Sequence, residues 1–491
     1  MRHEATEPAD PGRGWNRLET IVAGRRWILG VAALAAAVAL AGLAEYVRSA
    51  RSAPAPAGVR LARPARLQPT HAPVYPLRIG PGARYLVDRD GRPFLIVGDS
   101  PQSLIVNLSV KQADRFFANR QAAGFNSMWI NLLCDQYTAG RADGTTYDGI
   151  APFTKAGDLS TPNPAYFARA DEMVRLAARH HLVVFLDPIE TGGWLTVLRD
   201  NGTAKAYAYG RYVGERYKQF TNIVWLNGND FQTWSDPRDD ALALAVANGI
   251  KSVDPGALQT VELNYDTSMS LDDARWRGVL DLNAVYTYSA TYAEVLKAYE
   301  RGDHLPAFLL GASYEGEHDY TGPSTLRHQE YWSMLSGATG QFYGNKYTWQ
   351  FLPGWPDHLN TIGSRQVTFL ENLFSHRAWY DLVPDTRHRL VLSGYGSYSA
   401  GADVNGNDYV AAARTPDGRL AIAYLPTPHP VVVDLARMAG HRVRAQWYDP
   451  ASGTYRDIAG SPVPARGRRT FAPPGKNHGG DGDWVLVLSA T

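Results

Sequence analysis

The sequence contains a single cysteine, Cys134, among its 491 residues. One thiol cannot form an internal disulfide, and it excludes the metal sites that need several thiolates. Cys134 ends an apolar run, which favours the role of a small buried apolar residue. Net charge is also nearly absent, at a formal +1 at pH 7. Electrostatic attraction therefore gives no reason to expect a nucleic-acid partner.

Three catalytic motifs are missing as well. The 13 histidines form no H-E-x-x-H pair, so a zinc protease is not predicted, and we expect neither a metal nor another cofactor. The run from Gly311 to Glu315 has glutamate where a G-x-S-x-G nucleophile elbow needs its second glycine. No G-x-G-x-x-G follows the first predicted strand, which argues against an open dinucleotide-binding sheet.

Apolar and aromatic residues, in contrast, are plentiful. Hydrophobic residues make up 45% of the chain, which is enough for more than one domain. There are 13 Trp and 27 Tyr. Their rings offer flat apolar faces with a polar handle, which sugar-binding sites need, although a large core uses them too.

The first 76 residues predict an export segment and a linker. Residues 1–24 are polar, Arg25 and Arg26 precede an apolar run over 27–44, and residues 48–76 are rich in Ala, Pro and Arg. The run is long enough for a marginal membrane span, and a cleaved signal peptide fits it equally. Arginines after the run would favour keeping that side inside, but large domains translocate largely regardless of such charges. We expect segment 25–47 to place the rest of the chain in the cell envelope, either membrane-anchored or secreted, and 48–76 to be a disordered linker.

The remainder divides into two predicted domains. Eight short apolar runs alternate with helical patterns over 77–383, which predicts βαβ units and, by their number, a (β/α)8 TIM barrel. A doubly wound sheet is the rival fold. From residue 384 helical periodicity fades, and short alternating runs separated by turns such as Asp417-Gly418 predict a small all-β sandwich over 384–491.

Two of the predicted strands lead into the candidate catalytic carboxylates. Asp230 closes the run Ile-Val-Trp-Leu-Asn-Gly-Asn-Asp over 223–230, and Glu315 and Glu317 follow the apolar run over 307–312. By count these are the fourth and seventh strands. Barrel enzymes place catalytic groups at strand ends, and glycoside hydrolysis requires two carboxylates across a cleft. For Asp230 an ordinary turn that caps the next helix is the alternative.

The ordered motifs resemble the apiosidase-like glycoside hydrolases, a barrel family often followed by a domain called "putative collagen-binding". The matching stretches are Pro-Phe-Leu-Ile-Val-Gly-Asp (93–99), Gly-Phe-Asn (124–126), the run over 223–230, Tyr-Glu-Gly (314–316) and Gly-Ala-Thr-Gly-Gln-Phe-Tyr-Gly (337–344). The resemblance covers about residues 78–490. It implies a retaining glycosidase with Asp230 as general acid/base and Glu315 as nucleophile, Glu317 being held in reserve.

Two positions depart from the family pattern. The usual Gly-Gly-Asp reads Gly228-Asn229-Asp230, and relatives often carry another glutamate at the end of the seventh strand, where this chain has Gly311-Ala312. If that glutamate is the family's nucleophile, this chain has lost it.

The other candidate site residues are polar or aromatic groups that would bind substrate, or else serve as caps and core: Asp99, Asn131, Asp187, Tyr286, Tyr314, Glu317, Tyr347 and Trp349. The leading prediction is an exported glycoside hydrolase with a carbohydrate substrate and membrane contact through its N-terminal segment. The alternatives are a non-catalytic carbohydrate-binding protein on a decayed barrel and a surface adhesin acting through the β domain. Oligomeric state is left open.

Overall fold

The computed structural model describes residues 72–491 except 235 and 266. The predicted export segment and most of the linker therefore lie outside the described residues. Within the described part, no helix combines the length and the apolar character that crossing a membrane requires.

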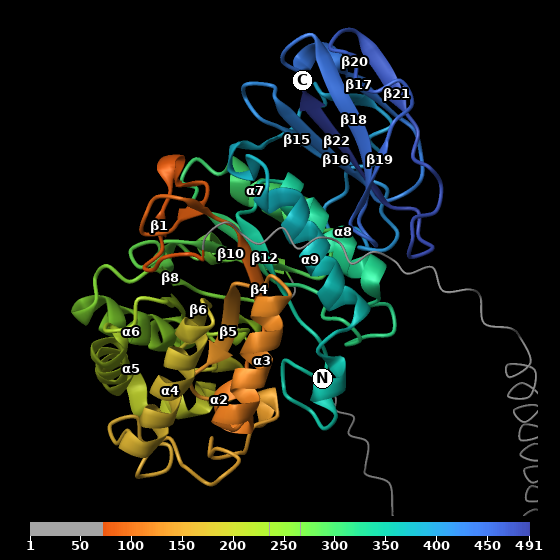
Figure 1. The fold of residues 1–491 in the computed structure, drawn as a ribbon. Coiled ribbons are helices and arrows are strands. Elements are labelled where there is room, and N and C mark those ends of the chain that lie inside the picture. Colours follow the sequence, from red (N-terminus) through yellow and green to blue (C-terminus); the bar gives the residue numbers. More distant parts are fainter. Residues whose placement is uncertain (1–71, 235, 266) are drawn as a thin grey trace, which may run out of the picture. The chain divides into compact units, whose positions relative to one another are not determined.

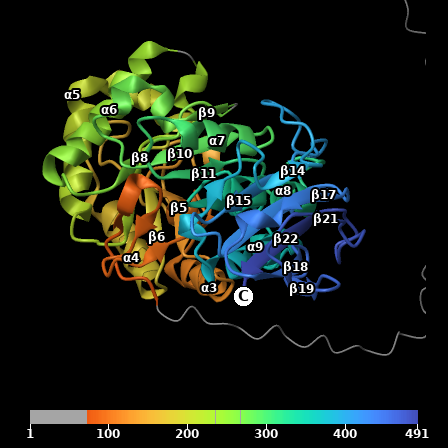
Figure 2. The ribbon, with the colours of Figure 1, turned by 90° about the horizontal axis from the view of Figure 1, so that it is seen from above.

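A curled sheet of parallel strands forms the first domain. The parallel strands hydrogen-bond in the order β8-β7-β6-β5-β4-β12-β11-β10. Helices surround them on the outside, as the view from above shows (Figure 2). This confirms the predicted (β/α)8 class, with β7 as the fourth and β11 as the seventh parallel strand. The strands are β4 (Ile96–Asp99), β5 (Ser127–Asn131), β6 (Val183–Asp187), β7 (Ile223–Leu226), β8 (Gln259–Thr260), β10 (Asn283–Thr287), β11 (Ala307–Gly311) and β12 (Gly340–Tyr343).

Several helices of this domain begin at a residue whose side chain caps the first turn. Ser109, Asn163 and Asp236 each accept a backbone N–H at the start of a helix, which satisfies donors that the first turn leaves free. The helices are α2 (Leu104–Asn107), α3 (Val110–Ala122), α4 (Pro164–Arg179), α5 (Thr191–Tyr217, kinked at Gly202), α6 (Pro237–Val253), α7 (Tyr292–Glu300), α8 (Pro323–Leu335) and α9 (Ile362–Ser375).

The barrel seam between β8 and β10 is closed by individual bonds and not by a strand ladder. The Gln259 carbonyl accepts the backbone N–H of Asp281 at 2.8 Å. The Ser270 hydroxyl donates to the Val261 carbonyl at 2.6 Å and accepts the Ala284 N–H at 2.9 Å. An extra strand, β9 (Thr267–Met269), pairs antiparallel with β10 beside this seam. The sequence did not indicate this insertion.

The barrel interior is a packed core. Phe185, Phe308 and Phe342 meet there with ring centroids 4.9 to 5.9 Å apart. Leu86 and Phe94 join the same core from a small antiparallel sheet of β1 (Arg78–Ile79), β2 (Leu86–Val87) and β3 (Pro93–Phe94). Because side chains fill the barrel, a ligand has room only beyond the strand ends.

The second domain is a β-sandwich, as predicted. One sheet has the order β13-β15-β16-β22-β18-β19 with β20 beside β18, and the other is β14-β17-β21 (Figure 1). The predicted boundary at residue 384 falls within β13. The strands are β13 (Val383–Pro384), β14 (Val391–Ser393), β15 (Ala411–Arg414), β16 (Leu420–Leu425), β17 (Val431–Asp434), β18 (Arg442–Asp449), β19 (Thr454–Asp457), β20 (Val463–Pro464), β21 (Arg468–Phe471) and β22 (Trp484–Ala490).

Strand β16 of the larger sheet is buried on both faces. In β16, Ala421, Ala423 and Leu425 pack into the sandwich core. The alternate residues Leu420, Ile422 and Tyr424 belong to the same hydrophobic core as the barrel helices. Helix α8, which lies against this sheet, is buried from Thr325 to Leu335. The two domains therefore share a core and are not joined by a flexible tether.

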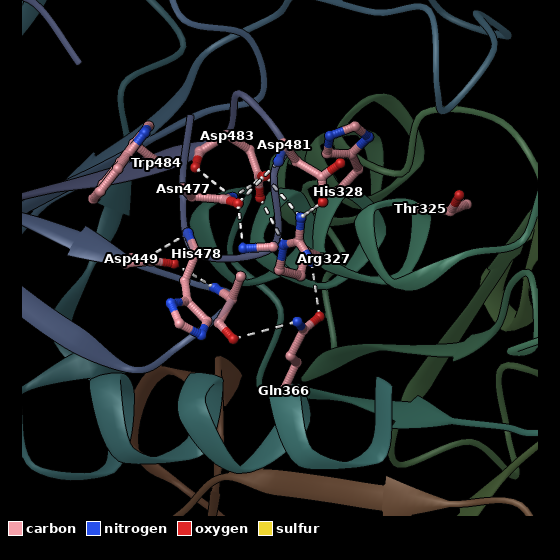
Figure 3. A network of polar contacts seen from close by, with 12 residues as sticks. Thr325, Arg327, His328, Gln366, Asp449, Asn477, His478, Asp481, Asp483 and Trp484 are labelled. Atoms are coloured by element: carbon pink, nitrogen blue, oxygen red, sulfur yellow. Dashed lines mark hydrogen bonds and ion pairs between the residues drawn. The ribbon is translucent and has the colours of Figure 1, made fainter. Parts of the chain in front are cut away.

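A buried ion pair fixes the contact between α8 and β22 (Figure 3). The Arg327 guanidinium donates to both carboxylate oxygens of Asp483 at 2.8 Å, and both side chains are at most 1% exposed. Arg327 also donates to Gln366 of α9 and to Asp481, each within 2.8 Å. Tyr424 donates to Asp483 at 2.9 Å. This network satisfies the polar groups that the domain contact buries.

Candidate active site

The turn that carries Asp230 is built by contacts from a neighbouring strand end. After β7 the chain passes through Gly228 and Asp230, both with left-handed backbone, φ 79° and 54°. The Gly228 N–H donates to Asp187 Oδ1 at 3.1 Å, and the Asn229 N–H donates to the Thr191 hydroxyl at 2.6 Å. A left-handed conformation is unfavourable for aspartate and persists where surrounding bonds hold it. Asn229 itself does not have a positive φ, which explains how it replaces the family's second glycine.

Asp230 lies buried at the mouth of the barrel, with 8% of its surface exposed. The Tyr137 hydroxyl donates to its Oδ2 at 2.5 Å, whereas Oδ1 has no hydrogen-bond partner within the described chain. Burial raises the pKa of Asp230 to about 6, the Tyr137 hydrogen bond lowers it, and the charge of Glu317 raises it. A carboxyl group of this kind holds a proton in mildly acidic solution and can release it near neutral pH.

Two further carboxyl groups lie within electrostatic reach of Asp230. Glu317 follows β11 and accepts the Tyr314 N–H at 3.3 Å, while Glu262 follows β8 and is 3% exposed. Burial raises the pKa of each. The charge of Glu317 further raises the pKa of Asp230, and the charge of Asp230 further raises that of Glu262. The three carboxyl groups therefore form one electrostatically linked cluster at the barrel mouth.

Glu262 was not among the predicted site residues. The sequence feature that could have indicated it is an acid within the otherwise apolar run Val261-Glu262-Leu263, directly after a strand. Inward and outward positions alternate along a strand. Leu258, four residues before Glu262 and so on the same face, packs against the barrel interior. Reading that alternation forward would have placed Glu262 on the inner face at the barrel mouth.

Glu315, predicted as the nucleophile, is held at the start of helix α9 and not beside Asp230. Its Oε1 accepts the Gly363 N–H at 2.9 Å. Its Oε2 accepts the hydroxyls of Tyr343 at 2.5 Å and Thr361 at 2.6 Å. An anion at a helix N-terminus stabilises the helix. Both oxygens are thus engaged in fixing α9, and these contacts argue against the predicted catalytic role.

Asp99 was predicted to bind sugar hydroxyls, and its contacts also indicate a structural role instead. It is 1% exposed and forms an ion pair with the fully buried Arg120 of α3, Nε to Oδ2 at 2.5 Å. Its other oxygen accepts the Ser100 N–H at 2.8 Å. The carboxylate therefore neutralises a buried guanidinium behind the sheet.

Several buried polar atoms near the strand ends have no hydrogen-bond partner among the described residues. They include both side-chain polar atoms of Asn131, Oδ2 of Asp187 and Oε1 of Gln102. Buried polar groups in proteins are nearly always hydrogen-bonded. Asn131 and Asp187 end the paired strands β5 and β6 and face each other in register. Their unpaired atoms are suited to hydrogen-bond the hydroxyl groups of a bound ligand.

The predicted aromatic residues fall into two groups. Tyr286 and Tyr314 lie near the acids: burial raises the pKa of both hydroxyls, as do the charges of Asp230 at Tyr286 and of Glu317 at Tyr314. Trp349 lies edge-on to Tyr314 with centroids 6.1 Å apart. Tyr347 instead stacks on His358 at 3.6 Å, in the loop before α9. The first three therefore form one group near the acids.

At Gly311, where relatives often carry a glutamate, the structure leaves no room for a side chain. A Cβ at this position would come within 2.4 Å of the Tyr286 ring. The ring thus takes the place of a side chain at the end of β11. Any carboxylate from the seventh strand must therefore come from the loop that follows, where Glu317 lies.

Carboxylates, tyrosines and unpaired amide groups at the carboxyl ends of parallel barrel strands define the class of (β/α)8 glycosidases. Over residues 72–491, apart from 235 and 266, no group of His, Cys, Asp and Glu is arranged to hold a metal ion.

The comparison with known families is consistent with this class. Residues 81–381 match the family model "Apiosidase-like, catalytic domain", and residues 397–489 match "Putative collagen-binding domain of a collagenase". The chain belongs to the apiosidase-like family and carries its glycosidase domain. No curated protein matches it.

Two solved structures share the fold over most of the chain. One, described as a glycoside hydrolase, is 22% identical, with 84% of this chain and 97% of the other covered and a TM-score of 0.73. The other is a family 5 glycoside hydrolase from Bacteroides vulgatus, 21% identical, with 84% and 93% covered and a TM-score of 0.73. At identities of 21% and 22% the likeness shows the fold alone. Because 84% of this chain is covered, it includes both domains.

Proposed function

We propose that this protein hydrolyses glycosidic bonds of an oligo- or polysaccharide by a retaining mechanism, with Asp230 as general acid/base and Glu317 as nucleophile. The observation that carries the proposal is the electrostatic interaction between these two carboxyl groups at the strand ends. Burial and the charge of Glu317, after the seventh strand, raise the pKa of Asp230, after the fourth strand, to about 6. A retaining glycosidase needs one protonated and one charged carboxyl group.

The proposed reaction has two steps. Glu317 attacks the anomeric carbon and forms a glycosyl ester, while Asp230 gives its proton to the leaving oxygen. Asp230, now charged, then takes a proton from water, which attacks the anomeric carbon, breaks its bond to the Glu317 oxygen and releases a sugar of unchanged anomeric configuration. Asn131 and Asp187 hydrogen-bond sugar hydroxyls, and Tyr286, Tyr314 and Trp349 contact the sugar rings.

A pH profile of kcat/KM tests the role of Asp230. A general acid must be protonated, so activity on a cleaved glycoside should fall about tenfold per pH unit above about pH 6, where Asp230 ionises. Tyr137→Phe removes a hydrogen bond that favours the charged form, so it should move this fall to higher pH. Measurement of kcat/KM from pH 4 to 8 with an aryl glycoside, selected from a panel of plant and bacterial sugars, checks the fall in the wild type and its displacement in Tyr137→Phe.

Asp230→Asn is the control for that profile. It should abolish the fall above pH 6, and it should cost less activity on an aryl glycoside with a good leaving group than on an oligosaccharide. A variant that keeps the wild-type profile would exclude Asp230 as the acid. A chain that binds glycans but cleaves none of the panel would support the alternative, a non-catalytic carbohydrate-binding protein.

The proposal includes export. The support is the sequence of residues 25–47, where two arginines precede an apolar run that a membrane-targeting segment requires. We expect the protein in the membrane or secreted fraction, either full-length or shortened near residue 47. Fractionation that finds only full-length protein in the cytoplasm would contradict export.

A further inference from the structure

Three aromatic rings lie side by side next to Glu317. The rings of His318 and Tyr320 stack with centroids 5.2 Å apart and an interplanar angle of 15°. Tyr288, after β10, lies edge-on to His318 at 6.3 Å. His318 Nε2 is 4.0 Å from the Glu317 carboxylate. Tyr320 is 51% exposed, so a large apolar surface faces solvent beside a proposed catalytic group.

The loop that carries His318 and Tyr320 is internally tied. The Gly316 N–H donates to the Thr321 carbonyl and the Thr321 N–H to the His318 carbonyl, each at 3.0 Å. The His318 N–H donates to the Thr321 hydroxyl at 3.0 Å. These bonds fix the backbone on both sides of the exposed ring. An exposed ring on a fixed backbone loses little conformational freedom when a ligand stacks on it.

The β domain hydrogen-bonds to the same loop. Asn405 Nδ2 donates to the Tyr320 carbonyl at 3.2 Å, and the Thr325 hydroxyl lies 2.7 Å from both that carbonyl and Asn405 Oδ1. Asn405 belongs to the connection between β14 and β15. The same connection contacts the loop after β10, where the Ala290 N–H donates to the Ala402 carbonyl at 2.9 Å.

We propose that Tyr288, His318 and Tyr320 form a stacking platform for a sugar residue beside the cleavage point, and that Asn405 is a positioning residue through which the β domain holds that platform. The inference rests on the proposed glycosidase function. A sugar ring has an apolar face of C–H groups, and a tyrosine ring offers a matching face with a polar edge. The platform adjoins Glu317, so a sugar bound there belongs to the chain being cleaved. We expect a small aryl glycoside, which offers a single sugar to the cleavage point, to depend less on the exposed ring of Tyr320.

Kinetics on two substrate sizes tests the platform. Tyr320→Ala should raise KM for an oligosaccharide of the cleaved sugar by about tenfold, the loss expected for one stacked ring, and leave kcat/KM for the aryl glycoside within about twofold. Asn405→Ala should raise the same KM by about threefold, because the platform remains but is less well held. Tyr207→Ala, which removes a tyrosine of α5 that is 37% exposed, is the control and should change neither value.

Binding without catalysis separates this inference from the proposed function. Native electrophoresis of the full chain carrying Glu317→Gln, in gels containing arabinoxylan, galactomannan or pectin, measures retardation directly. Tyr320→Ala should weaken retardation in at least one gel, and Tyr207→Ala should not. One outcome is that the wild type cleaves no substrate, while Tyr320→Ala still abolishes retardation. That result would support the platform and contradict the glycosidase proposal. Equal retardation of the Tyr320→Ala and Tyr207→Ala variants, or no retardation in any gel, would overturn the platform.

Discussion

Glu317→Gln is expected to lower kcat by about 10³-fold or more on every glycoside that the wild type cleaves. The amide cannot attack the anomeric carbon, and it also removes the charge that helps Asp230 to keep its proton. The loss should be as large on an activated aryl glycoside as on an oligosaccharide, because both need the nucleophile. Steady-state kinetics at pH 5 on both substrates measures it.

The matched control is the glutamate two positions earlier. Glu315→Gln keeps the size of the side chain but removes the charge at the α9 N-terminus and leaves hydroxyl and N–H donors facing an amide. It should lower the free energy of unfolding by roughly 1–3 kcal/mol and leave kcat within about threefold at a temperature where the protein is folded. Loss of activity in Glu315→Gln together with normal activity in Glu317→Gln would reverse the assignment.

The second large effect is expected at the domain contact. Arg327→Met should lower the free energy of unfolding by about 3–5 kcal/mol, because the buried carboxylate of Asp483 then has no counter-charge. Thermal and urea unfolding should show one transition at lower stability, since the barrel and the sandwich share a hydrophobic core.

Asp483→Asn provides the control for the ion pair. In the Arg327→Met background it should recover part of the lost stability, because it removes the unpaired charge. Limited proteolysis should not release a stable fragment of residues 384–491 from the wild type. An unchanged stability in Arg327→Met, or easy release of that fragment, would contradict a fixed domain contact.

The fold was largely predictable because its elements carry local signals. Buried parallel strands are short apolar runs, and the run that begins at Ile223 predicted the strand Ile223–Leu226. The seam between β8 and β10 was not predictable, since one hydroxyl, Ser270, bridges the two strands and carries no pattern. The pair Arg327 and Asp483 is 156 residues apart in the chain and has no local signal either.

The site was only partly predictable for a different reason. The end of β6 locates Asp187, because alternation along a strand fixes the direction of its side chain. After Gly311 the chain leaves the strand, and Gly316 turns it with a φ of 71°. Alternation no longer applies there, so the sequence could not show that Glu315 binds the start of α9 or that the charge of Glu317 acts on Asp230.

The most direct test of this account is to trap the covalent intermediate. A 2-deoxy-2-fluoro glycoside of the cleaved sugar slows the second step of a retaining enzyme, so the sugar stays attached to the nucleophile. Peptide mapping by mass spectrometry should then find the label on Glu317. A label on Glu315 or Glu262, or an active enzyme that is never labelled and releases the inverted anomer, would contradict the proposed mechanism.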